Sequence, residues 1–481
     1  MAGLFNALNS ARTSLEVSQK SIEITGNNIA NVNTEGYSRQ KANYETYPAM
    51  NFGDFFIGQG VKISDVSRDH DVFIDAQIKQ KAIDFGLQDA STRPLSELES
   101  VFNITEDNIS TDIDNFFDSL QELSADPSDL VQRNNVILQG EVLATSFNNT
   151  MNQLNSIKEN LNETILSKLD AVNAQINEIA DLNDRIYSIE IHGQTANSAR
   201  DQRDMLAKSL AQTLGAQSYE NDNGMLSVAL PGGMPLVQGN MAMTITADES
   251  GADLTLKLKA GGVTRDLTLK NMGGEFKGLM DIRDNFIPEL TADMDKLAYE
   301  LSTQVNLQHQ AGGGLDSSTG NLFFSIPPNY VASPPGPAPT ATEYAGAARQ
   351  MSVVITDPAK IAAGAAATTS ASGTVAPGDN SNALTLANIA DTYLIGGVDN
   401  FNSLYGKVAA KVGVESNQNQ LSLKGAEDAL DQLENFRDGL VGVSLEEEMI
   451  SLIQYQRGFE SSAKFLSTVD EMMTTILDIK R

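Results

Sequence analysis

A seven-residue repeat at the carboxyl end of the chain constrains its fold more than any other feature. Between residues 445 and 479, a large apolar side chain recurs every seven residues, and a mixed row stands four positions after it. The 3,4 alternation places both rows on one side of an α-helix, roughly 50 Å long at about 1.5 Å per residue. The large row is Leu445, Leu452, Phe459, Leu466 and Met473, and the mixed row is Met449, Gln456, Ala463, Asp470 and Leu477.

The same design occurs in the first thirty residues, with smaller partners. The large row is Leu8, Leu15, Ile22 and Ile29, and the alternate row is Leu4, Ala11, Ser18 and Thr25. A strict seven-residue period drifts against the helical turn of about 3.6 residues, so such helices supercoil around a partner. We infer that the two ends pair as a coiled coil, with about 40–440 inserted between them. The alternative is two unrelated amphipathic helices packed on a globular core.

Composition excludes several classes of partner. The chain has 481 residues, which suggests two to four domains, and a formal net charge of -30. That negative charge repels nucleic acid and anionic membranes, so neither is expected as a partner. There is no cysteine, and no run of about 18 apolar residues that predicts a membrane span. The amino terminus lacks a basic region before an apolar stretch, so any export is expected to proceed without a cleaved signal peptide.

Periodicity in the middle of the chain predicts a mainly α fold with a β insertion. An α-helical bundle is expected over 41–215 and 276–440, with a break or kink at Pro94. Its helices are predicted at about 69–103, 111–124, 128–190, 198–214, 276–310, 382–396 and 400–438. Residues 1–40 and 441–481 form the predicted terminal coiled-coil domain.

Strand signals mark the predicted insertion and the connections near the amino end. Residues 216–275 are expected to form a small β-rich domain, with a hairpin that turns at Gly261 and Gly262. Short strands are predicted within 37–47 and 61–66. Residues 311–378 are rich in proline, glycine and small residues, so surface loops are expected there, with one short strand at 353–355.

The chain carries no pattern typical of catalysis or of a bound cofactor. His70, His192 and His309 each lack a second histidine at ligand spacing, and solvated helix or loop positions explain them best. Two carboxylate pairs, Asp112 with Asp114 and Asp181 with Asp184, are explained by solvated helix surfaces. We therefore expect no catalytic, cofactor-binding or metal-binding residue, and the chain is not expected to be an enzyme.

An asparagine-rich segment ends the first helix. Asn27, Asn28 and Asn31 are followed by Gly36, and asparagine and glycine both suit a fraying helix end and a turn. A second interpretation is that the three amides, which share one helical face, bind a neighbouring subunit.

Both ends of the chain resemble the bacterial flagellar axial proteins, the family of rod, hook and hook-associated proteins. At the amino end the resemblance rests on GNNIANVNTEGYSRQ at 26–40, and at the carboxyl end on QYQRGFESSAK and STVDEM within the last helix. The GYSRQ and QYQ matches favour a hook-associated member over a hook or distal rod protein, which remains the nearest alternative. Together the close matches cover about the first 45 and last 45 residues.

The resemblance implies a structural junction subunit that assembles on the distal end of the hook and connects it to the filament. It implies self-assembly into a homo-oligomeric layer, with hook protein on one side and a second junction protein and the filament on the other. It also implies a cytoplasmic export chaperone at the C-terminal helix, and a final extracellular location in the flagellum. A rival from a different class is a secreted enzyme or adhesin displayed on a flagellar scaffold.

The assembly interface is expected on the terminal helices, on the apolar rows and the asparagine face. Its predicted residues are Leu4, Leu8, Leu15, Ile22, Asn27, Asn28, Ile29, Asn31, Leu445, Met449, Leu452, Phe459, Leu466, Met473 and Leu477.

Overall fold

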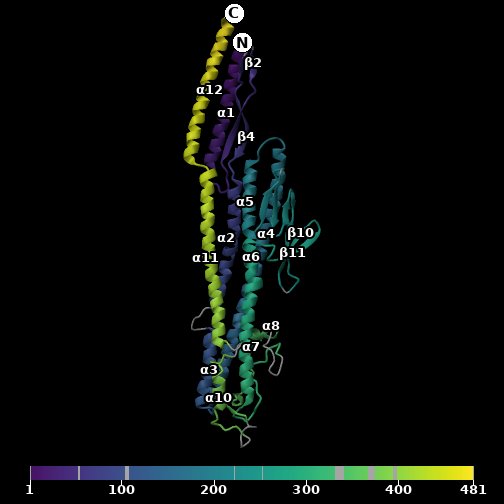
Figure 1. The fold of residues 1–481 in the computed structure, drawn as a ribbon, viewed down its shortest axis with the longest axis vertical. Helices are drawn as coiled ribbons and strands as arrows, with labels where there is room; N and C mark the ends of the chain where they lie inside the picture. The colour runs from purple at the N-terminus through teal and green to yellow at the C-terminus, as the bar shows by residue number, and fades with distance from the viewer. Residues whose placement is uncertain are drawn as a thin grey trace. The chain divides into compact units, whose positions relative to one another are not determined.

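The computed structural model describes residues 2–52, 55–102, 108–221, 223–251, 253–330, 341–366, 374–393 and 398–479. The chain divides into two compact units, each assembled from separate stretches of sequence (Figure 1). Unit 1 comprises Met1–Leu87, Ser167–Lys277 and Leu423–Arg481, and unit 2 comprises Gln88–Leu166 and Gly278–Ser422. None of the helices in the described ranges is long and apolar enough to cross a membrane.

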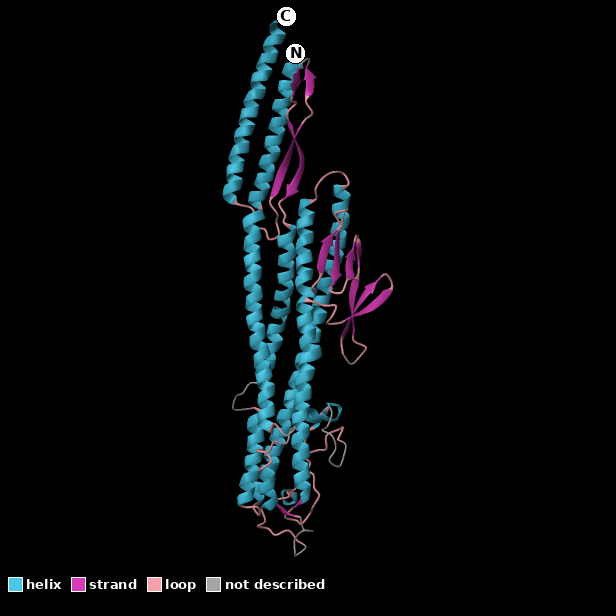
Figure 2. Ribbon diagram, in the orientation of Figure 1, coloured by secondary structure: helices cyan, strands magenta, loops and turns pink. Residues whose placement is uncertain are grey.

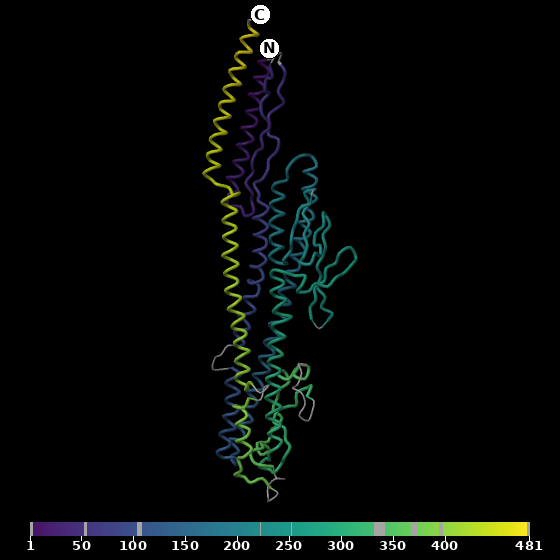
Figure 3. The backbone as a smooth tube through the Cα atoms, viewed as in Figure 1, coloured from purple at the N-terminus to yellow at the C-terminus, as the bar shows by residue number. Residues whose placement is uncertain are grey.

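Unit 1 contains the two terminal helices, which run side by side (Figure 1). Helix α1 spans Ala2–Ala30 and α12 spans Leu445–Ile479. Hence the predicted pairing of the two ends is confirmed, and both chain ends lie at the same end of this pair (Figure 3). Ser444 immediately precedes α12: its carbonyl accepts the Glu448 N–H at 2.9 Å, and its hydroxyl accepts the Glu447 N–H at 3.5 Å.

A β-hairpin continues from α1 and packs against it. Strand β1, Gln40–Thr46, pairs antiparallel with β4, Val61–Arg68, and a bulge separates Asn43 from Tyr44 in the register. Between them, β2 (Met50–Phe52) pairs with β3 (Phe55–Ile57). The two strands predicted within 37–47 and 61–66 are therefore confirmed.

The rest of unit 1 combines helices with two small sheets, drawn as magenta arrows in Figure 2. Helix α5, Asn197–Leu214, ends at Gly215 in the left-handed conformation. The first sheet has the order β5-β6-β7-β8 and the second β11-β10-β9. Their strands are Gln217–Glu220, Leu226–Leu230, Met234–Gln238, Met241–Ala242, Thr244–Asp248, Thr255–Ala260 and Val263–Leu267. All fall within the predicted insertion, and β10 and β11 form the predicted hairpin.

Several helices contribute residues to both units, because the sequence boundaries of the units fall inside them. These helices are α2 (Val72–Val101), α4 (Leu130–Glu190), α6 (Gly274–Asp281) and α11 (Phe401–Val441). The sequence predicts a break or a kink at Pro94; α2 continues through this residue, so there is no break. Proline costs one backbone hydrogen bond, and the burial of Leu95 and Leu98 in unit 2 offsets that cost.

The core of unit 2 is an aromatic cluster. Helix α3, Ile109–Ala125, supplies Phe116, which lies 5.3 Å from Phe323 and 5.5 Å from Phe324 between ring centroids. Phe117 stacks on Phe401 at 5.9 Å. Each ring buries roughly 150 to 250 Å², so this cluster dominates the apolar packing of unit 2.

Around this core, unit 2 is completed by the long helix α7 and by short elements. A π-helical turn at Ile282–Phe286 leads into α7, Ile287–Ala311. The short elements are α8 (Ala341–Tyr344), α9 (Ala347–Gln350), α10 (Ser381–Ala387), β12 (Gly312–Gly313) and β13 (Gly364–Ala365). Helix α10 is shorter than predicted, and Val353 makes a single β-bridge with Phe324 in place of a strand. Parts of the loop-rich prediction, 331–340 and 367–373, lie outside the described residues.

His309 lies in the interior of unit 2, so the prediction of a solvated position was wrong for this histidine. Its side chain is 1% exposed. The ring Nδ1 lies 2.7 Å from the Asn321 carbonyl and the ring Nε2 accepts the Ala362 N–H at 2.9 Å. That pair of contacts requires a neutral ring with its proton on Nδ1. Burial, aided by the nearby Arg133, lowers the pKa of His309 to about 4.

We predict that His309 makes the fold less stable in acid. Between pH 6.5 and 4 the unfolded chain binds a proton at this site that the folded chain excludes, so the free energy of unfolding falls with pH. By pH 4.5 the loss is about 2.5 kcal/mol. Denaturant unfolding at pH 7 and 4.5 should show a smaller loss for His309→Gln, whereas His192→Gln, at an exposed position, should behave like the natural chain. Equal losses in all three proteins would contradict this account.

Candidate functional site

Helix α1 contacts α12 through its small side chains. Ala11, Ser18 and Thr25 are 2%, 9% and 3% exposed. A Cβ atom added to Gly458 of α12 would lie 3.3 Å from the Ser18 hydroxyl oxygen. The hydroxyls of Ser14 and Ser462 are hydrogen-bonded at 2.9 Å. Small residues therefore let the two helices approach closely, and the alternate row of α1 is the one that this contact buries.

The large apolar rows remain partly uncovered. Among the predicted interface residues of α1, Leu4, Leu8, Leu15, Ile22 and Ile29 are all half-buried. On α12, the half-buried members are Leu452, Phe459, Leu466 and Met473. Leu445, Met449 and Leu477 are 46%, 56% and 55% exposed. A single chain thus leaves a continuous apolar flank along its terminal pair.

The sequence places a mixed row, which begins at Met449, beside the large apolar row of α12. In the structure, a different row lies beside the large row on the side of α12 that faces α1. Glu448 and Val469 are 3% and 2% exposed, and Tyr455 and Ser462 lie between them at the same spacing. This row precedes the predicted one by a single residue, which is about 100° around a helix. The row with Met449 consequently faces away from the intramolecular contact.

The base of the helix pair is held by a buried polar network that we call the Glu448 cluster, formed by Asn28, Tyr37, Arg39, Gln40 and Glu448. Arg39 Nε donates to Glu448 Oε1 at 2.7 Å, and Asn28 Nδ2 donates to Glu448 Oε2 at 3.0 Å. Asn28 Nδ2 also donates to the Gln40 carbonyl at 2.9 Å. The Asn28 oxygen accepts the Tyr37 hydroxyl at 2.8 Å and the Gln40 N–H at 3.0 Å.

The pKa values of Arg39 and Tyr37 are shifted within the Glu448 cluster. Burial lowers the pKa of Arg39, but the carboxylates of Glu448 and Glu447 more than offset this and raise it overall. Burial, reinforced by the negative charges of Asp201 and Glu448, raises the pKa of Tyr37 to about 12. Tyr37 therefore stays a hydrogen-bond donor over the range in which proteins are folded. The network joins residues 420 positions apart in sequence.

The three asparagines that were predicted to share one helical face, Asn27, Asn28 and Asn31, have different surroundings in the structure. Asn28 is 1% exposed and makes its hydrogen bonds within the chain, so it does not face outward as the second interpretation of these residues expects. The turn after α1 brings residues 37–40 back over it. Asn31 donates to the Asn27 side chain at 2.7 Å, and Asn27 remains exposed.

The turn that follows α1 is anchored to α5. Gly36 has φ +75°, a left-handed conformation that glycine adopts most easily, and a Cβ atom there would lie 2.1 Å from the sulfur of Met205 and displace that side chain. Ser38 Oγ donates to Asp201 Oδ1 at 2.7 Å. Arg68 Nη1 donates to the same oxygen at 2.7 Å, and Arg68 Nη2 pairs with Asp204 Oδ2 at 2.6 Å. These contacts, together with the Glu448 cluster, account for each residue of GYSRQ.

The hairpin adds contacts and exposed aromatic rings that the sequence did not single out. The Tyr44 hydroxyl is 2.9 Å from that of Ser21 on α1 and donates to Tyr455 of α12 at 3.1 Å. At the β3 end of the hairpin, Phe55 and Phe56 are 72% and 75% exposed. Two adjacent phenylalanines that follow a Gly-Asp pair in the sequence are the signal that could have indicated this exposed position.

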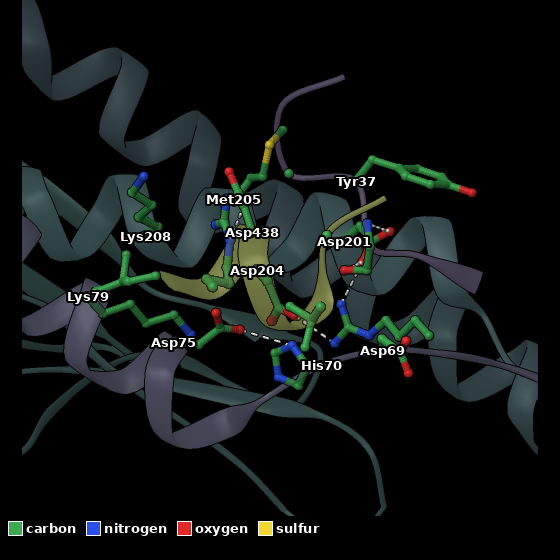
Figure 4. A pocket seen from close by; sticks show the side chains of 17 residues that line it. Tyr37, Asp69, His70, Asp75, Lys79, Asp201, Asp204, Met205, Lys208 and Asp438 are labelled. Atoms are coloured by element: carbon green, nitrogen blue, oxygen red, sulfur yellow. Dashed lines mark hydrogen bonds and ion pairs between the residues drawn. The ribbon is translucent and has the colours of Figure 1, made fainter. Parts of the chain in front are cut away.

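A pocket of about 80 Å³ lies beside the turn, between the ends of β4 and α11 and the helices α2 and α5 (Figure 4). Asp201 and Arg68 line it, and so do His70, Asp75 and Asp204. His70 Nδ1 lies 2.9 Å from Asp75 Oδ2. His192 is exposed at the end of α4, in agreement with its predicted solvated position.

Three family models match the chain. Residues 95–324 match the helical domain of the flagellar hook-associated protein FlgK. Residues 440–479 match the C-terminal region of the flagellar basal body rod proteins FlgEFG, and residues 8–37 match a flagella basal body rod protein model. The two rod matches fall on α12 and α1.

Individual proteins agree with the family models over the whole chain. The flagellar hook-associated protein 1 of Bacillus subtilis is 25% identical over 516 aligned residues, which cover 99% of both proteins. The protein of the same name from Escherichia coli is 24% identical, with 98% of this chain and 99% of the relative covered. The structure of the flagellar hook junction protein FlgK from Burkholderia pseudomallei has the same fold, with a TM-score of 0.65, 16% identity, and coverage of 76% of this chain and 99% of that one.

Proposed function

Because this chain belongs to the family of flagellar hook-associated protein 1, we propose how its terminal helix pair performs the structural role of that family at the junction of hook and filament. The family is structural and not enzymatic. The observation that carries the proposal is that α1 and α12 pair through small residues and leave their large apolar rows partly uncovered. A second copy of the chain can cover those rows.

The energetics favour association. Burying one leucine or phenylalanine side chain completely contributes about 1.5 to 3 kcal/mol, and the terminal helices offer nine large apolar side chains in the two seven-residue rows. Half of that contribution, summed over the nine side chains, is about 7 to 14 kcal/mol, which is of the same order as the cost of association. The result is a homo-oligomeric layer in which the terminal pairs of neighbouring copies pack together. Within that layer, exposed Asn27 supplies an amide to a neighbour.

The chain's neighbours follow from this position in the flagellum. Hook protein lies on one side of the layer, and a second junction protein and the filament lie on the other. Before export, a cytoplasmic chaperone covers the apolar flank of α12, which would otherwise expose Met449 and Leu477. The chain then reaches the extracellular part of the flagellum. The overall charge of -30 keeps free copies apart until these apolar flanks meet.

Relatives named hook-associated protein 1 match along nearly the whole chain, which favours a junction protein over a hook or distal rod protein. The rod models, in contrast, match only the terminal helices. A secreted enzyme or adhesin on a flagellar scaffold would require a catalytic or binding site in the inserted region, for which the sequence gives no motif.

A deletion strain tests the proposal. Electron microscopy is expected to show complete hooks without filaments, and a blot of the medium is expected to show unpolymerised filament protein. Both follow because filament subunits would have no surface on which to polymerise. Missing hooks would move the assignment to the hook or rod, and normal flagella would overturn the proposed role. Complementation with the natural chain provides the control.

A further inference from the structure

One histidine and two aspartates from different elements of unit 1 converge at the pocket beside the GYSRQ turn (Figure 4). His70 follows β4, Asp75 lies in the first turn of α2, and Asp204 lies on α5. One ligand atom from each of the three lies within 4.8 Å of the other two. The sequence does not reveal this group, because Asp204 is more than a hundred residues from the other two.

We propose that His70, Asp75 and Asp204 bind a divalent transition-metal ion, with Zn²⁺ as the best match. Zn²⁺ accepts both imidazole nitrogen and carboxylate oxygen as ligands, whereas Ca²⁺ and Mg²⁺ prefer oxygen ligands alone. Bonds of about 2.1 Å in a tetrahedron place neighbouring ligand atoms about 3.4 Å apart. His70 Nδ1 and Asp75 Oδ2 are 2.9 Å apart, so a small opening there and a small closure toward Asp204 complete the site.

Asp75 and Asp204 each have a carboxylate oxygen available for a metal ion. Asp204 uses Oδ2 for Arg68, at 2.6 Å, and Asp75 uses Oδ2 for His70. In the part of the chain that the structure describes, Oδ1 of neither aspartate accepts a hydrogen bond. Asp204 can therefore keep its contact with Arg68 and offer Oδ1 to the ion. The pocket opens directly on these groups and supplies the fourth position for water.

Positive side chains near the site do not occupy it. Lys79 donates to Ser218 at 3.1 Å, Arg437 pairs with Asp438 at 2.8 Å, and Lys208 pairs with Glu434. Arg68 divides its guanidinium between Asp201 and Asp204. Each cation thus has a partner other than the proposed metal ligands, except for the shared oxygen of Asp204. The nearby positive charge weakens cation binding, so we expect affinity in the micromolar range.

A metal ion at this position joins three elements that meet where the GYSRQ turn is anchored. It links the segment after β4 to α2 and to α5, directly beside the Arg68 contacts. Because only the folded chain brings the three ligands together, bound metal stabilises the native state. The role that follows is structural: the ion stiffens the support on which the Glu448 cluster rests.

Calorimetric titration of the chelator-treated full-length chain with zinc chloride tests this site. One Zn²⁺ is expected to bind per chain, and the midpoint of thermal unfolding should rise when zinc is added. Affinity should fall about tenfold or more in His70→Gln and in Asp75→Asn, since each removes one ligand. His192→Gln removes an exposed histidine of the same unit and should bind as the natural chain does.

Two results would overturn the proposal. One is no saturable zinc binding by the natural chain up to millimolar concentration. The other is a zinc site that persists with unchanged affinity in both His70→Gln and Asp75→Asn, which would place the ion elsewhere. Circular dichroism of each variant verifies that it is folded, and the two variants alter different elements, so misfolding of one leaves the other as a test.

Discussion

Cells that produce the Phe459→Asp variant of this chain are expected to assemble hooks that carry no filaments. Phe459 lies in the middle of the large apolar row of α12 and is half-buried in the isolated chain. In the proposed layer, neighbouring copies bury the rest of that row. An aspartate there places a charge in an apolar contact, which costs several kcal/mol for each copy. Electron micrographs of whole cells measure the result as the fraction of hooks that bear filaments.

A matched control distinguishes the loss of the apolar contact at Phe459 from the general effect of an added negative charge on α12. Ser461→Asp introduces the same carboxylate two residues later, at an exposed position of α12 outside its three seven-residue rows, and should leave filaments at their normal number. A blot of the medium should detect both variants, because the substitution at Phe459 acts after export. Normal filaments on Phe459→Asp cells would show that this row does not take part in assembly.

Glu448→Ala is expected to release α12 from α1 at the base of the pair. The substitution leaves Arg39 and Asn28, both largely buried, without their shared acceptor. Removing one partner of a buried ion pair costs about 3 to 5 kcal/mol. Hydrogen exchange of the α12 amides should report this as a loss of about 4 kcal/mol in the free energy of local opening.

Glu447→Ala is the control, because Glu447 binds the same arginine from the surface. Its carboxylate is 2.9 Å from Arg39 Nη1, and its side chain is 64% exposed. An exposed ion pair contributes about 0.2 to 1 kcal/mol, so the amides of α12 should remain nearly as protected as in the natural chain. If both variants lost a similar free energy of local opening, the burial of Glu448 would not account for the stability of the helix pair.

Periodicity predicted the elements well because it depends on local geometry. The seven-residue rows identified α1 and α12 and their pairing, and the helical spacing located α4 and α5 to within about two residues. The same rows did not predict which face of each helix the pair buries. On α1 that face includes Ala11, Ser18 and Thr25, whose small side chains allow the two helices to approach closely.

The polar contacts could not be predicted from the sequence, for a different reason. Asn28 meets Glu448 across 420 positions, and His70 meets Asp204 across two unit boundaries in the sequence. Neither spacing follows a local rule, since tertiary folding alone sets it. His309 shows the same limit, because a lone histidine on a helix gives no sign that a distant loop will cover it.

The Glu448 cluster joins residues 28–40 to Glu448, which lies far along the chain. This separation in sequence also affects which chains can assemble. Closing a loop of 420 residues costs about 5 kcal/mol in chain entropy for an unfolded polypeptide, and that cost falls once the intervening units have folded. The pairing of α1 with α12 therefore costs less chain entropy once the intervening units have folded. A molecule cut short before Glu448, or misfolded in its middle, cannot complete it. In the proposed layer, such a molecule would lack the paired flank through which copies associate.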